Sequence, residues 1–549
     1  MKKTSKILAL LLSLLMIVGL LAGCGGSGSK TPDAAPSGDA AKTDTGDKQE
    51  SNSGLDVRDV TDDQAKEDVT KDEDTNETRT LNISLSDDCG TLNPMASQGS
   101  FVSVTYAFYE PLWDFLPSGE RVWLLATSYE PVNETQYKLT LREGVKFANG
   151  NDFTAEDVLF TMKLCAEDPR FYLNVKAIDL EKTCVTGKYT MDVYYTNYDV
   201  TQEPNMLQML IYDEESYDPE YMSNHTIGTG KYIVTDYVVN SHITAERNEN
   251  YWGDKANIKT INFKVIGEAA QIINAIETGD IDVASVVSVS DADYVKSLGY
   301  TLDTRWGGYC NTAYLSFHGA LASKEARWAV AYAFDRESMN LAMYNGMSTY
   351  PDHPVSDHMI DFQEGFRDLT DYYVEGYNLE KAKEYAEKSG LVGQTLKIIT
   401  NGNETYNDAA QILKNSLNQI GVDATITPLD QATYFSALMD ASGFDIGFYF
   451  ASSPSMLASD VIANYPDFVP LDWTGPEHDA FSEIAHACVH EFDETKRAEL
   501  LSQAMVMFAD ACMWVPVNES LALRGWDSDV ANVVYMLAGN CDYGQITFK

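Results

Sequence analysis

Apolar and polar positions alternate with two different periods along this chain. Alternation at every second residue over 81–85 and 137–141 predicts strands with one buried face. Apolar residues three and four positions apart predict amphipathic helices over 269–276, 326–334 and 409–420. The chain from residue 79 onward is therefore predicted to be a mixture of helices and strands.

Start and stop signals agree with these periods. Thr154 is followed three residues later by Asp157, which resembles a capping box, and Asp335 is placed to cap the helix that follows it. Gly279 ends one apolar helical face, and a short strand is predicted over 281–283. Repeated units of helix, glycine and strand favour an α/β fold in which helices flank sheets.

The N-terminus has the features of a secretory signal. Lys2, Lys3 and Lys6 precede an apolar run over 7–21, which is shorter than the roughly 20 residues that a membrane-spanning helix needs. The run ends in Leu-Ala-Gly followed by Cys24, which resembles a bacterial lipobox. We therefore expect a signal peptide over 1–23 and a mature protein that begins with a lipid-modified Cys24.

The segment that follows is predicted to be a tether. Residues 25–78 contain no Phe, Trp or Tyr and are rich in Gly, Ser, Asp, Lys and Thr, so they cannot bury enough apolar area to offset the entropy of ordering. We expect an acidic, disordered linker over 24–78 that holds the folded part away from a membrane. A lipid anchor with such a tether suggests the outer face of a Gram-positive cell.

Composition narrows the function. The formal net charge of −44 argues against a nucleic-acid partner, because phosphate binding needs a basic footprint. We explain this charge as a solvated acidic surface that keeps the protein soluble, in preference to a surface that attracts cationic ligands. Seven cysteines remain besides Cys24, so at least one is unpaired. A bridge between Cys165 and Cys184 is conceivable, but pairing cannot be deduced from spacing.

One segment carries a specific family resemblance. Residues 137–158, which read YKLTLREGVKFANGNDFTAEDV, closely resemble the hallmark segment of extracellular solute-binding proteins of family 5, the oligopeptide- and dipeptide-binding lipoproteins of ATP-binding-cassette importers. Further matching segments follow in the family's order, among them GTGKY at 228–232, ERNENYW at 246–252 and RWAVAYAFDR at 327–336. The resemblance covers about residues 80–549.

The resemblance implies a fold and a domain plan. The expected fold is α/β, a two-lobed periplasmic-binding-protein-like fold of type II, cluster C, with an extra subdomain in lobe I. The expected divisions are lobe I with its inserted subdomain over 79–300, lobe II over 301–515, and a C-terminal return to lobe I over 516–549. The family captures a solute between two closing lobes and delivers it to a permease and an ATPase in the membrane.

Ligand contacts are predicted at two places. The stretch that enters lobe II supplies Trp306, Tyr309 and Asn311, and aromatic side chains there could cover a ligand and exclude water. The second place resembles a segment in which peptide-binding members carry an Asp for the peptide ammonium. This chain has Tyr449 and Phe450 there, followed by serine, of which Ser453 is the candidate. A serine cannot supply the full counter-charge, so the ligand of this chain need not offer a free ammonium.

Other functions find less support. His486 and His490 lie four residues apart and could face a metal on one helix, but they are better explained as solvated helix residues, and no metal, cofactor or catalytic residue is predicted. Nucleophile elbows, zinc-protease motifs and phosphate-binding loops are missing from the sequence. The preferred function is capture of an oligopeptide or dipeptide. The alternatives are an oligosaccharide or a nickel complex on the same fold, then a secreted hydrolase or a surface adhesin.

Overall fold

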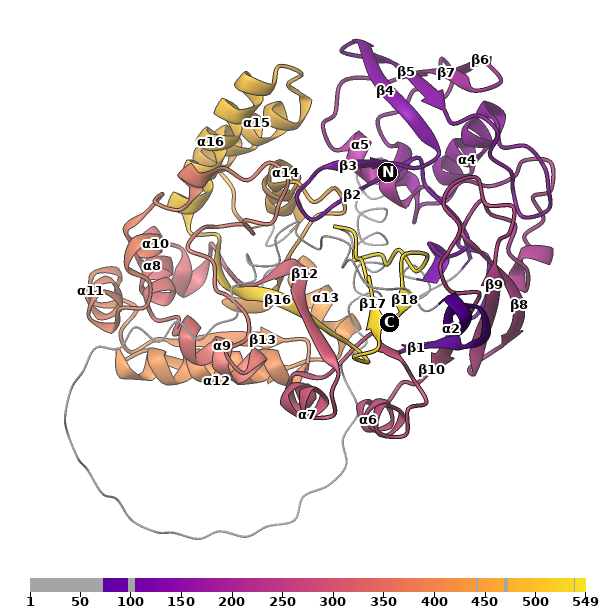
Figure 1. The fold of residues 1–549 in the computed structure, drawn as a ribbon. Helices are drawn as coiled ribbons and strands as arrows, with labels where there is room; N and C mark the ends of the chain where they lie inside the picture. Colours follow the sequence, from indigo (N-terminus) through magenta and orange to yellow (C-terminus); the bar gives the residue numbers. More distant parts are fainter. Residues whose placement is uncertain (1–72, 97–103, 441–442, 469–471, 538) are drawn as a thin grey trace.

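The computed structural model describes residues 73–96, 104–440, 443–468, 472–537 and 539–549 (Figure 1). The predicted signal peptide and Cys24 lie outside these residues, as does the predicted tether up to residue 72. Residues 73–78 were predicted to belong to that tether, but they form helix α2 (Glu73–Thr78). Asn76 is buried there and donates a hydrogen bond to Thr547 at 2.8 Å, so contact with the C-terminus orders this short polar helix.

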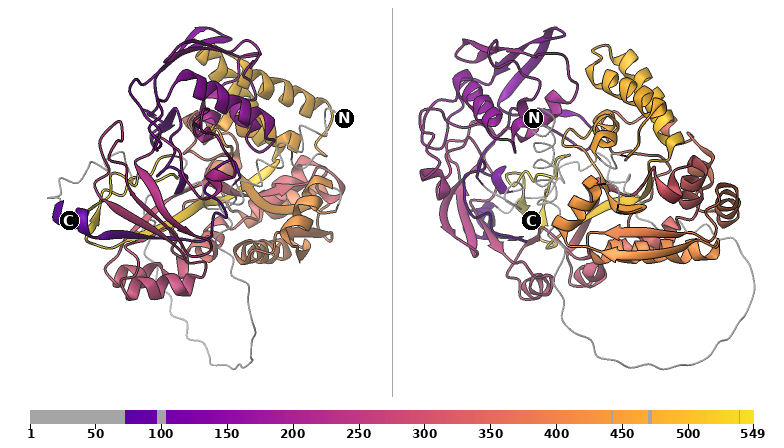
Figure 2. Two further views of the ribbon diagram at one scale, coloured as in Figure 1. Left: turned by 90° about the vertical axis from the view of Figure 1, so that its right-hand side faces the viewer. Right: turned by 180° about the vertical axis from the view of Figure 1, so that it is seen from behind.

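A ten-stranded sheet runs through the whole molecule (Figures 1 and 2). Its strands follow the spatial order β14-β13-β15-β12-β16-β11-β1-β10-β9-β8. In that order they are Asp423–Pro428, Thr395–Thr400, Ile446–Ala451, Thr301–Leu315, Trp514–Trp526, Val283–Ala284, Thr80–Leu85, Thr260–Val265, His242–Arg247 and Tyr232–Val238.

Two long strands connect the two halves of this sheet. β12 and β16 pair antiparallel from one end to the other: residues 301–306 pair with 521–526, and residues 310–314 pair with 514–519. At one end β16 borders β11, and at the other end β12 borders β15. We call the half with β1 and β8–β11 lobe I and the half with β13–β15 lobe II. Both lobes therefore share a two-stranded connection.

Lobe I carries a smaller sheet with its own core. Its strands, in spatial order, are β4 (Ala126–Asn133), β5 (Gln136–Leu141), β7 (Thr190–Tyr194) and β6 (Cys184–Gly187). Helix α4 (Ala155–Glu167) packs on this subdomain, and the backbone N–H of Thr154 donates to the Asp157 carboxylate at 2.7 Å, which confirms the predicted start of the helix. The other elements of lobe I are β2 (Trp113–Phe115), β3 (Arg121–Trp123), α5 (Gln202–Asn205), α6 (Ala269–Glu277), α7 (Ala292–Ser297), β17 (Val530–Ala531) and β18 (Thr547–Phe548).

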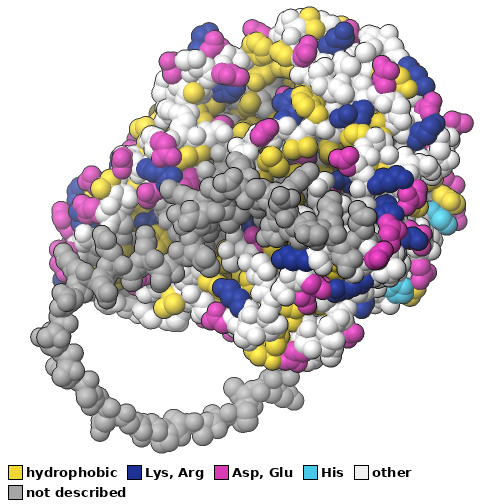
Figure 3. Space-filling view, viewed as in Figure 1, with side chains coloured by type: hydrophobic (Ala, Val, Ile, Leu, Met, Phe, Trp, Pro, Cys, Tyr) yellow, Lys and Arg dark blue, Asp and Glu magenta, His cyan; other side chains and the backbone are white. Residues whose placement is uncertain are grey.

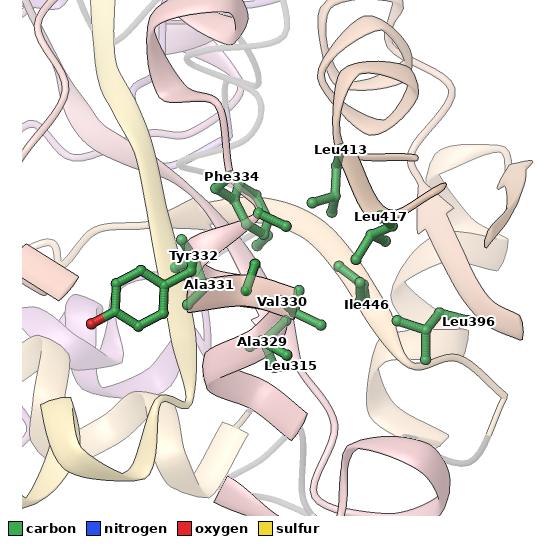
Figure 4. Packing of buried hydrophobic residues seen from close by; sticks show 14 of the residues in the cluster. Leu315, Ala329, Val330, Ala331, Tyr332, Phe334, Leu396, Leu413, Leu417 and Ile446 are labelled. Atoms are coloured by element: carbon green, nitrogen blue, oxygen red, sulfur yellow. The ribbon is translucent and has the colours of Figure 1, made fainter. Parts of the chain in front are cut away.

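Lobe II packs helices against parallel strands. Figure 4 shows Val330 and Phe334, from α8 and just after it, meeting Leu413 and Leu417 of α12 and Ile446 of β15. All of these side chains are fully buried. The helices of lobe II are α8 (Lys324–Tyr332), α9 (Arg336–Tyr344), α10 (Asp371–Glu375), α11 (Leu379–Ser389), α12 (Glu404–Gln419), α13 (Gln431–Asp440), α14 (Ala458–Phe468), α15 (Pro476–His490) and α16 (Glu494–Ala511).

The local predictions hold at each of these elements. The strands predicted over 81–85 and 137–141 are β1 and β5, and the helices predicted over 269–276, 326–334 and 409–420 are α6, α8 and α12, which differ by a few residues at their ends. Asp335 caps α9 by accepting the Ser338 N–H at 3.1 Å. The α/β, two-lobed fold class is confirmed.

Cysteine pairing and surface charge complete the description. Cys165 is buried and Cys184 is exposed, and both are free thiols, so the conceivable bridge between them is not formed. Acidic side chains are scattered over the face shown in Figure 3, with basic side chains among them. Within the described residues, no helix combines the length and the apolar character that crossing a membrane requires.

Candidate functional site

The junction between the lobes contains a break in the β12–β16 ladder. The register shifts between Trp306 and Cys310, and two of the three residues inside the break are glycines. Gly308 has a φ of +93°, and a Cβ on Gly307 would lie 2.7 Å from the Ser520 hydroxyl oxygen. Only glycine tolerates both conditions, because a side chain would be strained at one position and would clash at the other. The sequence Trp-Gly-Gly-Tyr therefore builds a bulge at the point where one lobe becomes the other.

The bulge places two half-buried aromatic rings side by side. The Trp306 indole N–H donates to the Tyr309 carbonyl oxygen at 3.1 Å, and its ring stacks on His358 with centroids 5.2 Å apart. The Tyr309 ring lies against Phe450, with centroids 5.0 Å apart. Both rings are anchored on one side and retain exposed surface. This is the arrangement expected of an aromatic wall that a ligand can cover.

The other predicted contacts lie deeper in lobe II. Asn311 is 2% exposed, donates to Asn518 at 2.8 Å and accepts from the Tyr406 hydroxyl at 2.7 Å. Tyr449 is 1% exposed and stacks on Phe450 at 4.2 Å. These two side chains support the wall formed by Trp306 and Tyr309. Phe450, which is also buried, joins the two groups.

Ser453 belongs to a buried polar cluster at the start of α14. Its hydroxyl bonds to the Asp460 carboxylate and lies 2.7 Å from the Ser455 hydroxyl, which itself donates to Asp460 at 2.7 Å. Asn464 donates to the other carboxylate oxygen. A carboxylate is therefore present close to the serine that replaces the expected Asp, although it comes from a position seven residues later.

The positive charge facing this carboxylate comes from the opposite lobe. Lys176, which follows a short 3₁₀ turn of the lobe I subdomain, lies 3.3 Å from Asp199. Burial alone would lower the pKa of Lys176, but the carboxylates of Asp460 and Asp199 raise it, so the ammonium stays charged. Lys176 thus forms an ion pair with Asp199 of its own lobe, and the Asp460 carboxylate of lobe II adds to the charge that keeps its ammonium protonated.

A second contact between the lobes lies beside this cluster. The Val200 N–H of lobe I donates to the Val489 carbonyl oxygen near the end of α15 at 2.9 Å. The Tyr198 carbonyl oxygen lies 2.7 Å from the His490 ring nitrogen Nδ1, and the Tyr198 hydroxyl lies 3.2 Å from Arg497. We call residues 197–200 with residues 489–497 the interlobe clasp. Figure 1 shows α15 and α16 of lobe II facing the subdomain of lobe I.

The clasp leads to a testable prediction about closure. The Tyr198 ring meets Phe492 edge-to-face with centroids 5.1 Å apart, and its hydroxyl bonds to Arg497. We expect Tyr198→Ala to weaken solute binding by roughly 5- to 30-fold, because a ring pair and one hydrogen bond together contribute about 1–2 kcal/mol to the closed form. Isothermal titration calorimetry with a bound solute measures this change.

The matched control is Tyr221→Ala. Tyr221 stacks on His225 within lobe I, with centroids 4.1 Å apart, so its removal costs a similar ring contact without touching lobe II. Equal affinities for Tyr198→Ala and the wild type would show that the clasp does not contribute to closure.

The sequence did not point to Lys176, Asp199, Asp460 or the clasp. A lysine after a short turn and an aspartate early in a helix have no distinctive spacing, and their pairing depends on the position of one lobe relative to the other. His490 was predicted to be a solvated helix residue, and it is exposed; its contact with the Tyr198 carbonyl of lobe I was not predicted. Among the described residues, no group of three or more His, Cys, Asp or Glu side chains is arranged to hold a metal ion.

The structure thus has two lobes joined by shared strands, with half-buried aromatic side chains at their junction. Comparison with known proteins agrees. Residues 121–464 match the model of the bacterial extracellular solute-binding proteins, family 5 (middle region). Because this match covers more than half of the chain, the protein belongs to that family.

Relatives that are named for different ligands share nearly the same sequence identity with this chain. The nickel-binding periplasmic protein of Escherichia coli is 23% identical over 81% of this chain and 90% of its own length. The oligopeptide-binding protein OppA of Bacillus subtilis is 22% identical over 86% of this chain and 93% of its own length. The crystal structure of the ABC transporter substrate-binding protein CtaP from Listeria monocytogenes aligns with a TM-score of 0.75 at 19% identity, over 85% of this chain and 99% of that chain.

Proposed function

We propose that this protein is the lipid-anchored substrate-binding component of an ATP-binding-cassette importer, and that it captures short peptides on the outer face of the membrane. Lipid on Cys24 holds it there, and the closed form delivers the peptide to a permease and its ATPase. The observation that carries the proposal is the aromatic wall of Trp306 and Tyr309 at the junction of two lobes that meet across the clasp and the Lys176 cluster.

The polar cluster refines the class of peptide. A ligand ammonium placed near Ser453 would meet an Asp460 carboxylate that already accepts hydrogen bonds from two serines and an asparagine and that interacts electrostatically with Lys176. The proposed ligand is therefore gripped through main-chain hydrogen bonds and aromatic contact, and not through its N-terminal charge. N-acetylated peptides are then expected to bind about as well as free ones, within roughly threefold.

A thermal-shift screen tests this function. The screen compares free and N-acetylated peptides of two to six residues with oligosaccharides, nickel chelates and haem. A bound peptide is expected to raise the unfolding midpoint, because a ligand that binds only the folded state stabilises it in proportion to the logarithm of its concentration over Kd. Stabilisation by a sugar or a metal complex, with none by any peptide, would overturn the peptide assignment.

The wall itself is tested by Trp306→Ala. Removing the indole exposes His358 and deletes most of one face of the proposed contact, so binding of the best peptide is expected to weaken by about 10- to 100-fold, the range typical of a buried aromatic anchor. Trp123→Ala, in a two-stranded ribbon of lobe I, is the matched control. Mass spectrometry of the released peptide checks that it leaves intact, since cleavage would indicate a hydrolase.

A further inference from the structure

Lobe II contains a cavity of about 540 Å³ that is separate from the junction of the lobes. It lies between the start of α9, the end of α10 and the connecting segment 349–357. All of its lining residues fall within 335–377, apart from Glu519 on β16. The cavity therefore lies in lobe II and reaches the shared strand β16, but the aromatic wall does not line it.

Glu519 is the unusual group in the wall of this cavity. Its side chain is 2% exposed, and neither carboxylate oxygen receives a hydrogen bond of normal geometry; Ser356 and Trp306 are its nearest side-chain donors. Its backbone is fixed, because its N–H donates to the Thr349 carbonyl oxygen at 2.8 Å and its own carbonyl accepts from Ser348. A buried carboxylate without hydrogen-bonding partners is costly, which points to a missing partner.

The charges around the cavity are strongly unequal. Six carboxylates line it, and the guanidinium groups of Arg336 and Arg367 are the cations; the carboxylates are Asp335, Glu337, Asp352, Asp357, Glu375 and Glu519. Arg367 is already engaged by Asp352 and Asp357, each at 2.8 Å. Arg336 donates to the Pro351 carbonyl oxygen and lies over the Tyr372 ring at 5.0 Å. Neither guanidinium therefore offsets Glu519 through direct contact.

Aromatic groups complete the lining. Tyr350, Tyr373 and Tyr377 border the same cavity. The faces of tyrosine rings attract ammonium and guanidinium groups, and the rings also cover the aliphatic stem that carries such a group. Negative charge at one wall and aromatic surface at the others form a site with the chemistry of an organic-cation receptor.

We propose that this cavity binds an organic cation, an alkylammonium or alkylguanidinium group, with Glu519 as its counter-charge. The group can come from a free small amine or from a basic side chain of a peptide. The cavity lining does not include Trp306, Tyr309 or Phe450, so binding of a small cation can be measured separately from capture of a peptide.

Binding at this site is linked to pH. Burial first, and then Asp357, raise the pKa of Glu519 to about 8, so the empty site is mostly protonated at pH 7. The charged or titratable neighbours are Asp357 and His353 on the connecting segment, Arg336 on α9 and Cys310 on β12. A bound cation favours the ionised carboxylate. We therefore expect release of about 0.9 proton per cation bound at pH 7, and affinity about 50-fold higher at pH 8 than at pH 6.

Titration calorimetry of the purified protein with N-butylguanidinium tests the proposal. N-butylurea, which has a similar shape but no charge, is the ligand control. We expect saturable binding of the cation only, weakened at least 10-fold by Glu519→Gln and unchanged by Glu130→Gln, an exposed position on β4 of lobe I. Val374→Arg, at an exposed position on the cavity rim, is expected to block binding without disturbing the core.

A comparison of two peptides identifies the source of the cation. If Ala-Arg-Ala-Ala binds more tightly than Ala-Ala-Ala-Ala and only this difference depends on Glu519, the basic side chain of a peptide is the occupant. Binding of N-butylguanidinium that depends on Glu519, without any Glu519-dependent difference between the two peptides, identifies a free small cation as the occupant. Equal binding of N-butylurea, or indifference of every arm to Glu519→Gln, overturns the proposal. Binding of Ala-Ala-Ala-Ala reports separately on the proposed capture of peptides.

Discussion

Replacing Asp460 by Asn is expected to weaken binding of the best peptide by roughly 30- to 150-fold. Lys176 forms an ion pair with Asp199 of lobe I, and the carboxylates of Asp460 and Asp199 both raise its pKa. Without Asp460, closure would bury the ammonium near one carboxylate in place of two. Leaving a buried charge poorly compensated costs several kcal/mol, and with the Asp199 ion pair still present we expect about 2–3 kcal/mol. Calorimetry gives the affinity, and small-angle X-ray scattering gives the extent of closure.

The double variant separates charge from packing. Lys176→Met combined with Asp460→Asn removes both charges, so its affinity is expected to lie closer to the wild type than that of Asp460→Asn alone. Asp479→Asn, an exposed position in the first turn of α15, controls for loss of one negative charge on lobe II. If Asp460→Asn binds and closes like the wild type, the cluster has no part in closure.

The second large effect concerns stability and pH. We expect Glu519→Gln to stabilise the protein by about 3–5 kcal/mol at pH 8 and to change it little at pH 4. The carboxyl has a pKa of about 8 when folded, against about 4.3 in an unfolded chain. Between these two pKa values, Glu519 is protonated in the folded state and ionised in the unfolded chain. The wild type therefore loses stability as the pH rises through this window. The glutamine side chain does not ionise, so the stability of the variant does not fall in this way.

Urea unfolding at pH 4, 6 and 8 measures this difference. The wild-type free energy of unfolding is expected to fall relative to that of the variant across this range, and Glu130→Gln is expected to follow the wild type. A constant difference between wild type and Glu519→Gln at all three values would mean that Glu519 is ionised in the fold. In that case its pKa is not raised, and the pH linkage of cation binding is lost with it.

Much of the fold could be predicted from the sequence, because the signals involved are local. The alternation of apolar and polar residues over 81–85 and 137–141 correctly predicted β1 and β5. The capping box of Thr154 and Asp157 correctly predicted the start of α4. The ordered motifs of the hallmark segment indicated the family. Such signals depend on contacts within a few residues, which sequence spacing records directly.

The candidate site could be predicted only in part. Trp306, Tyr309 and Phe450 were expected near a ligand, and the structure brings them together around the bulge. Whether they contact a solute stays a prediction. Asn311 and Tyr449 were chosen because of their residue types, but both are almost fully buried inside lobe II, and that burial depends on tertiary packing that residue type does not record.

The sequence by itself determined the helices and strands, the family and an aromatic stretch at the entry to lobe II. Only the tertiary structure decided which polar groups meet: Lys176 with Asp199 near Asp460, Arg497 with the Tyr198 hydroxyl, and Glu519 with the lining of a cavity in lobe II. These groups lie far apart in the chain and sit in unremarkable local patterns. Their energies depend on burial and on the distance between lobes, which are properties of the assembled fold and leave no periodic trace along the chain.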